Sequence, residues 1–246
     1  MTDPVWYQRA SPFTRMGPKR FFQVPVSLQD LPPIDFILLS HDHYDHFDKK
    51  TLHYLATKNI PVITMLGVGS RLRKLGISSK RITELDWWQQ IQLADHFTIT
   101  ALPARHFSGR SLMDRFTTLW GSFALQGPQH SVYYGADSGY YDGFKIIGDA
   151  FGPFDLAMLE IGAYNPLWDD IHLGPENAAQ ACLDVKGSLL LPLHWGTFAL
   201  AFHPWTEPIE QLLAAAKNKG VSLLVPAPGE TRVVSNGAYL NRWWEA

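Results

Sequence analysis

The segment at residues 38–50, LLSHDHYDHFDKK, gathers three histidines and three aspartates within eight positions, directly after an apolar run. His41 and His43 are two positions apart, so their imidazoles point to one side if the chain stays extended after a strand. Asp45 and His46 follow where the chain turns towards the next helix, and they can reach a second point close by. Imidazole and carboxylate groups in this combination suit Zn²⁺. The H-x-H-x-D-H spacing therefore predicts a metal site rather than a polar loop with solvated histidines.

Four residues in one loop cannot complete two metal sites, so further ligands are expected elsewhere in the chain. Three suitable residues follow other apolar runs: His106 follows FTITALP, Asp137 follows SVYYGA, and His194 follows SLLLPL. In an open α/β sheet, residues beyond the strand ends converge on a shared crevice. Each residue alone is better explained as a hydrogen-bonding loop residue. Their joint occurrence beside the first motif indicates that they complete the site.

The elements that must position these residues are short apolar runs alternating with helical segments, which predicts an α/β domain with buried strands. Asp48 is a candidate N-cap of the first helix, and two later helical segments open with Pro and close with Gly. The segment 116–126, FTTLWGSFALQ, alternates like a hairpin strand. Strands are predicted over 34–40, 61–66, 97–103, 131–136, 154–162, 188–193, 221–226 and 231–235. Helices are predicted over 48–59, 70–76, 175–187 and 208–220.

The length of 246 residues suits one large domain or two small ones, and we expect a single domain over residues 1–246. The chain is 46% hydrophobic and 18% charged, which provides for a sizeable core. Its formal net charge of -2, without a long basic run, argues against nucleic acid as a partner. The lone cysteine, Cys182, excludes an intramolecular disulfide and suits a reducing compartment. No apolar stretch approaches the roughly 20 residues of a membrane span, and the N-terminal segment lacks the features of a signal peptide. A cytoplasmic location is expected.

The order of these motifs resembles the metallo-β-lactamase superfamily. The segments MGPKRF and HWGTFAL resemble more narrowly the N-acyl-phosphatidylethanolamine-hydrolysing phospholipase D branch and its bacterial relatives, and this resemblance runs over nearly the whole chain. It implies a four-layer αββα sandwich with two zinc ions in a cleft at its edge, although iron or manganese would accept the same ligands. The implied ligands are His41, His43 and His106 for the first ion, Asp45, His46 and His194 for the second, and Asp137 as the bridge.

The resemblance also implies a reaction. A hydroxide shared by the two ions would attack a phosphodiester, which in this branch releases an N-acylethanolamine and phosphatidic acid. The substrate would be a small-molecule or lipid phosphodiester, and a lipid would bring peripheral contact with the inner face of a membrane. The composition leaves the oligomeric state open.

Four other residues match family positions or the expected pocket. His172 matches an active-site histidine that would bind phosphate or supply a proton, and the alternative is a surface histidine at a helix start. Asp3 matches an acidic position that orients a ligand imidazole. Tyr164 and Trp195 are expected to line the pocket, with plain core packing as the alternative.

The chain departs from the family pattern at its start. Members of the branch begin with several strands before the TDP segment, including a W-x-G-H-A/S motif, whereas this chain starts at MTDP. We therefore expect an N-terminally incomplete first sheet and a tendency to aggregate. Two other functions stay open: hydrolysis of a lactone or another carbonyl ester or amide, such as a thioester or β-lactam, in the same fold, and a non-catalytic metal-binding fragment.

Overall fold

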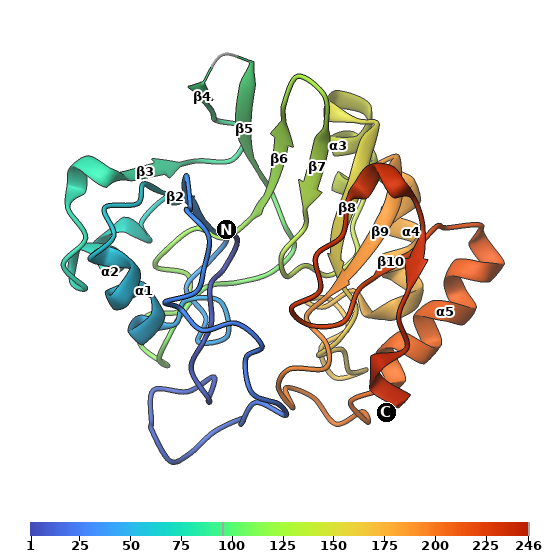
Figure 1. The fold of residues 1–246 in the computed structure, drawn as a ribbon, viewed down its shortest axis with the longest axis horizontal. Coiled ribbons are helices and arrows are strands. Elements are labelled where there is room, and N and C mark those ends of the chain that lie inside the picture. The colour runs from blue at the N-terminus through green and yellow to red at the C-terminus, as the bar shows by residue number, and fades with distance from the viewer. Residues whose placement is uncertain (95, 246) are drawn as a thin grey trace.

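The computed structural model describes residues 1–94 and 96–245, which form two main sheets flanked by helices (Figure 1). The first sheet has the order β1-β2-β3, with β1 at Ile37–Leu39, β2 at Val62–Met65 and β3 at Ile82–Leu85. The second sheet has the order β4-β5-β6-β7-β8-β9. Its strands are β4 (Gln90–Ala94), β5 (Phe97–Leu102), β6 (Ser122–Gln126), β7 (Ser131–Tyr134), β8 (Phe154–Glu160) and β9 (Gly187–Leu193).

The helices lie on the outer sides of the two sheets (Figure 1). The helices α1 and α2 lie beside the first sheet, and α3, α4 and α5 lie beside the second (Figure 1). Their bounds are α1 (Lys49–Ala56), α2 (Gly69–Arg73), α3 (Gly143–Phe151), α4 (Gly174–Asp184) and α5 (Glu207–Lys219). A short parallel pair, β10 (Leu224–Val225) and β11 (Tyr239–Leu240), joins β9 through a bridge between Leu190 and Leu223.

Strand directions bring several strand ends to one edge of the second sheet. The strands β7, β8 and β9 are parallel to one another. Both β5 and β7 are antiparallel to β6, so β5 runs in the same direction as β7. The first sheet is parallel throughout. Residues that follow β5, β7, β8 and β9 are thereby directed to a common region, as in other sheets with parallel strands.

Two large apolar cores hold the layers together, besides a smaller cluster of Leu156, Leu189 and Leu224. One core joins Leu39 of β1 and Leu52 of α1 to Phe123 of β6, so it lies between the two sheets and reaches the outer helix. The other packs Phe144 of α3 and Leu212 of α5 with residues of the second sheet. Buried apolar surface of this kind is the main stabilising contribution to such a fold. The predicted α/β class and its layering of helix, sheet, sheet and helix are confirmed.

Most predicted elements appear with shorter bounds. The side chain of Asp48 accepts a hydrogen bond of 3.1 Å from the backbone N–H of Lys50, as predicted for the N-cap of α1. The helix α5 ends at Lys219 and is capped by Gly220, which adopts a left-handed conformation with φ 71°. The predicted hairpin strand within 116–126 is β6, although its first residues form a turn instead.

The predicted strand over 231–235 is wrong. Its residues form an irregular segment that leads into a 3-10 turn at Val234–Asn236, and the side chain of Val233 is 58% exposed. A strand needs a partner on its edge and a surface to pack against, and this segment has neither within the described residues. The strand that pairs with β10 forms a few residues later, at Tyr239–Leu240.

The helix α3 was not predicted. Its sequence, GFKIIGDAF, contains Gly143 and Gly148, and glycine weakens a helix by about 1 kcal/mol relative to alanine. Packing compensates for this low propensity, because Phe144 and Ile147 are fully buried against the second sheet. A Cβ atom on Gly148 would lie 2.1 Å from the carbonyl oxygen of Asp184, so the glycine allows α3 to approach α4 closely.

Candidate metal centre

The predicted ligands lie in loops at the ends of strands, and the structure brings all seven together. The loop after β1 carries four of them, and the loops after β5, β7 and β9 carry one each. These residues are His41, His43, Asp45 and His46 after β1, His106 after β5, Asp137 after β7 and His194 after β9. The agreement with the expected convergence follows from the shared direction of the strands.

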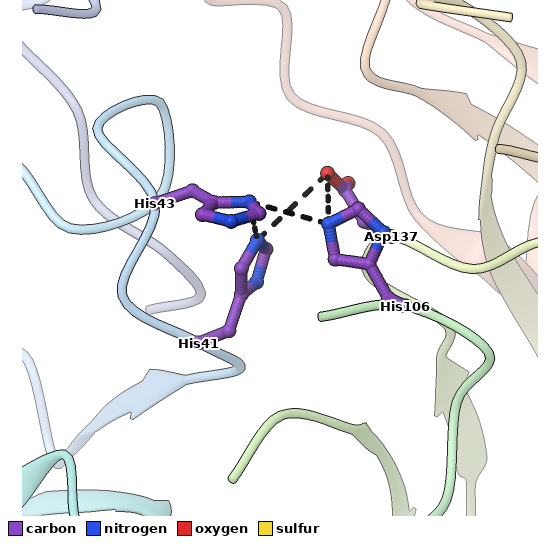
Figure 2. Close-up of side chains that lie close together, drawn as sticks. All are labelled: His41, His43, His106 and Asp137. Atoms are coloured by element: carbon purple, nitrogen blue, oxygen red, sulfur yellow. Dashed lines mark hydrogen bonds and ion pairs between the residues drawn. The ribbon is translucent and has the colours of Figure 1, made fainter. Parts of the chain in front are cut away.

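Three histidines and one aspartate form the first group (Figure 2). The Nε2 atom of His41 lies 2.9 Å from Nδ1 of His43, and Nε2 of His106 lies 3.2 Å from the same nitrogen. The Oδ2 atom of Asp137 lies 3.9 Å from Nε2 of His41 and 3.7 Å from Nε2 of His106. One ligand atom from each residue lies within 4.8 Å of the others, which suits a single metal ion.

The second group shares Asp137 with the first. The Nε2 atom of His194 lies 2.9 Å from Oδ2 of Asp45, and Nε2 of His46 lies 3.7 Å from the same oxygen. The Oδ2 atom of Asp137 is 3.1 Å from Nε2 of His46 and 3.5 Å from Nε2 of His194. Because this oxygen faces imidazoles of both groups, Asp137 is the residue placed to bridge two ions.

The hydrogen bonds of His106 and His46 leave one lone pair of each ring directed into the cluster. The Nδ1 atom of His106 lies 3.0 Å from the carbonyl oxygen of Ile171, which can only accept, so this nitrogen donates and Nε2 keeps its lone pair. The Nδ1 atom of His46 donates in the same way to Oδ2 of Asp3 at 2.7 Å. The Nε2 atom of His46 and Oδ1 of Asp137 are buried without a hydrogen-bond partner among the described residues. Converging lone pairs and buried unpaired acceptors fit bound metal cations.

Electrostatics within the first group favour the charge states that metal ligands need. Burial lowers the pKa of His41 well below its usual value, and neighbouring imidazoles lower it further. Burial likewise lowers the pKa of His43, and that of His106 to about 3. For Asp137, burial alone would raise the pKa, but the nearby His194 and other histidines hold it well below its usual value. The first group therefore offers neutral imidazoles and an ionised carboxylate.

Asp3 lies where an acidic residue that orients a ligand imidazole was predicted. Besides its contact with His46, its Oδ1 accepts a hydrogen bond of 2.8 Å from the backbone N–H of Ser40. The hydroxyl of Tyr134 donates to Oδ2 at 2.6 Å. These donors fix the carboxylate and, through it, the ring plane of His46.

The remaining aspartates of the first motif do structural work. The Oδ1 atom of Asp42 accepts a hydrogen bond of 2.7 Å from the backbone N–H of Gly109, and its carboxylate pairs with Arg71. Asp48 caps α1 and also accepts the backbone N–H of Tyr7 at 3.0 Å. The segment is therefore rich in titratable groups for two reasons. Four of them are predicted ligands, and the other two fix the conformation of the loop.

His172 lies beside the cluster, and its partner is a residue that sequence reasoning missed. Its Nδ1 atom is 2.6 Å from Oε2 of Glu160, the last residue of β8. Its ring stacks on that of His194 with centroids 5.5 Å apart. The sequence does contain a signal for Glu160, because this acidic residue ends the apolar strand FDLAMLE. That strand lies between the strands that precede Asp137 and His194.

Two cavities border the cluster. One, of about 300 Å³, is lined by Asp45, His46, Asp137 and His194 together with the N-terminal segment and Arg20. The other, of about 220 Å³, is lined by the same Asp45, Asp137 and His194 and by His43, His106, Phe107, Trp168 and His172. Six of the seven predicted ligands therefore border at least one of these two cavities, and His41 borders neither.

Tyr164 and Trp195 do not line either of these two cavities. The hydroxyl of Tyr164 donates to Glu207 at 2.6 Å, and its ring stacks on His203. Trp195 packs against Trp243 and lines a third cavity, which His194 also lines. Tyr164 therefore has a packing role, whereas Trp195 borders a cavity next to one predicted ligand.

The comparisons with known proteins agree with this geometry. Residues 1–195 match the family model of the β-lactamase superfamily domain. The chain is 50% identical to an uncharacterised protein of Mycobacterium tuberculosis over 99% of this chain and 66% of that protein. It is 37% identical to N-acyl-phosphatidylethanolamine-hydrolyzing phospholipase D 1 of Caenorhabditis elegans over 86% of this chain and 63% of that protein. The chain therefore spans about two thirds or less of the length of these relatives.

A solved structure supports the fold. The isothiocyanate hydrolase from Delia radicum gut bacteria superposes with a TM-score of 0.73 at 20% identity, over 94% of this chain and 90% of that one. The chain belongs to the metallo-β-lactamase superfamily, and it carries the His and Asp cluster at the strand ends of that fold. None of the helices in the described part of the chain has the length and apolar character needed to cross a bilayer.

Proposed function

We propose that this chain is a metal-dependent hydrolase that cleaves a phosphodiester with two zinc ions. The observation that carries this proposal is the position of Asp137, whose Oδ2 faces Nε2 atoms of both histidine groups at 3.1–3.9 Å. A shared carboxylate between two sets of nitrogen ligands is the arrangement that a dinuclear site requires.

The residues divide between the two ions as the resemblance implies. His41, His43 and His106 would hold the first ion, and Asp45, His46 and His194 the second, with Asp137 contributing to both. When bound, two such ions generate a nucleophile from water at neutral pH and offset the negative charge that develops on a phosphoryl group. Nitrogen and oxygen ligands also accept iron or manganese, so the metal in the cell has to be measured.

His172 has the place of a substrate-contacting residue. It lines the 220 Å³ cavity together with ligands of both groups, and Glu160 fixes its Nδ1. Its other nitrogen, Nε2, is then available to a phosphoryl oxygen or to the leaving oxygen of a substrate in that cavity.

A lipid is the substrate class that the surface favours. Phe107 and Trp168 line the cavity, and each contacts a further aromatic ring, Phe116 and Phe202 respectively. Phe202 is 81% exposed and Leu167 is 83% exposed. Exposed apolar side chains at a cavity mouth are suited to contact acyl chains or a membrane surface. The name of the relative in Caenorhabditis elegans also describes a phospholipid as its substrate. We include peripheral contact with a membrane in the proposal.

Substrate profiling of the zinc-loaded protein tests this function. We expect hydrolysis of bis-p-nitrophenyl phosphate and of N-acyl-phosphatidylethanolamine in mixed vesicles, and little hydrolysis of a simple lactone. Asp137→Ala should lower the rate by about 100-fold or more, since even partners of metal ligands contribute about 10–100-fold. The control is Asp149→Ala, whose side chain is 75% exposed and pairs only with Lys186 among the described residues. Faster turnover of the lactone would transfer the proposal to carbonyl substrates, and bound metal without turnover of any ester would contradict it.

A further inference from the structure

Glu160 is a fully buried carboxylate at the end of β8, in the middle of the strands that carry the site. Its Oε2 atom lies 2.6 Å from Nδ1 of His172 and 3.5 Å from Nδ1 of His194. Its Oε1 atom accepts hydrogen bonds from the backbone N–H groups of Ser138 at 2.6 Å and Leu173 at 3.4 Å. Each partner is either a site histidine or the residue directly after one of the site residues Asp137 and His172.

A buried carboxylate is costly unless its oxygens are fully hydrogen-bonded or paired. Within the described residues, the ion pairs of Glu160 are with His172 and His194 rather than with Lys or Arg. The site itself therefore compensates the charge of Glu160. One carboxylate links three loops, namely those that carry Asp137, His172 and His194.

We infer that Glu160 is a positioning residue for His172. Its Oε2 atom accepts the proton of Nδ1 at 2.6 Å, which fixes both the ring orientation and the nitrogen that carries this proton. The other ring nitrogen, Nε2, is then the one presented to the cavity that His172 lines. The inference goes beyond the ligand set because Glu160 belongs to neither of the two metal groups formed by the predicted ligands. Only the expected effect of Glu160 on turnover rests on the proposed function. The positioning of His172 does not depend on it.

The hydrogen bonds of Glu160 make the effect of Glu160→Gln predictable. The two backbone N–H groups of Ser138 and Leu173 both require an acceptor, so the amide oxygen of the glutamine takes the place of Oε1. The amide NH₂ group then faces Nδ1 of His172, where it can only donate. Nδ1 must become the acceptor, and its proton is lost or moves to Nε2.

Nitrogen NMR of histidine-labelled, zinc-loaded protein tests this inference without any substrate. We expect a protonated Nδ1 of His172 in the wild type and an unprotonated Nδ1 in Glu160→Gln, with the signals assigned by their absence in His172→Ala. The control is Glu176→Gln, since Glu176 is 70% exposed and pairs with Lys219. An unprotonated Nδ1 in the wild type would overturn the inference even if the variant failed to fold. An Nδ1 that stays protonated in a folded variant would also overturn it.

Turnover provides a second, separate readout. With bis-p-nitrophenyl phosphate, Glu160→Gln should lower kcat by about 10-fold or more at unchanged zinc content, because positioned proton donors and acceptors contribute about 100-fold or more. In the His172→Ala background the same change should have little further effect, since residues that act as a unit are not additive. Equal effects of Glu160→Gln in both backgrounds would contradict the link to His172. Absence of turnover in the wild type would refute the proposed function and leave the NMR result standing.

Discussion

The Nδ1 atom of His46 lies 2.7 Å from Oδ2 of Asp3, and both side chains are almost completely buried. The two residues are 43 positions apart in the sequence, and the pairing brings the start of the chain to the candidate metal centre. Because the carboxylate holds the proton of Nδ1, the Nε2 atom of His46 is left as an acceptor that faces Asp137. A partner of this kind increases the basicity of a ligand imidazole and fixes its ring.

Asp3→Ala is therefore expected to weaken binding at the second metal position. Loss of such a partner typically costs about 10–100-fold in metal affinity. Titration of the apo protein with zinc, followed by calorimetry, should show one weakened step and one that is nearly unchanged. The matched control is Asp30→Ala, whose exposed carboxylate accepts a hydrogen bond from Ser27. Two unchanged binding steps in Asp3→Ala would contradict the assigned role.

Gly162→Ala should displace His194 from the site. A Cβ atom on Gly162 would lie 2.2 Å from the carbonyl oxygen of His194, so the backbone of one of the two residues has to shift. His194 already adopts a left-handed conformation with φ 59°, which the surrounding structure maintains. We expect a loss of about 1–3 kcal/mol in the free energy of unfolding, together with weaker binding of the second metal ion.

Urea unfolding and zinc titration of the same protein check this prediction. The control is Gly127→Ala in the turn between β6 and β7, where the nearest atom to the added Cβ lies at 3.4 Å. Normal zinc binding in a folded Gly162→Ala protein would show that the close approach has no effect on His194.

Protonation of the Asp114 carboxyl in acid should lower the free energy of unfolding. Partial burial would raise the pKa of this carboxyl, but hydrogen bonds from the backbone of Arg110 and Ser111 and contact with Arg71 outweigh it and lower the pKa to about 2. A carboxyl with a lowered pKa stabilises the folded state above its unfolded pKa, and this contribution is lost as the pH falls through the folded value.

Asp114→Asn should therefore be less stable than the wild type by about 1 kcal/mol above pH 5. The difference should shrink as the pH falls from about 4 towards about 2. Comparing the two proteins at each pH cancels the loss of metal that acid causes in both. Asp149→Asn serves as the control with an exposed carboxylate. A difference that stays constant down to pH 2.5 would contradict the prediction.

The ligand set could be predicted from the sequence because it depends on short-range features, namely residue spacing within one loop and position after a strand. His41, His43 and His46 are spaced within one loop, and His106 and His194 lie in the loops after apolar strands. Parallel strands then determine that these ends meet. The geometry agrees with the prediction at all seven positions, while their binding of metal stays a prediction.

The residues that were missed depend on contacts between distant segments. Glu160 is important because of its partners Ser138 and His172, and no local pattern identifies those partners. The helix α3 has weak intrinsic propensity and is stabilised by burying Phe144. Tyr164 was expected at the pocket or in core packing, and its hydroxyl donates to Glu207, 43 positions further along the chain.

The measurement that tests the central claim most directly is the metal content of the purified chain by mass spectrometry, for the wild type and Asp137→Ala. Because Asp137 faces both histidine groups, the account predicts about two metal ions per chain in the wild type and about one or fewer in the variant. Wild-type protein without tightly bound metal, or a variant that retains the full content, would contradict a dinuclear centre built on Asp137.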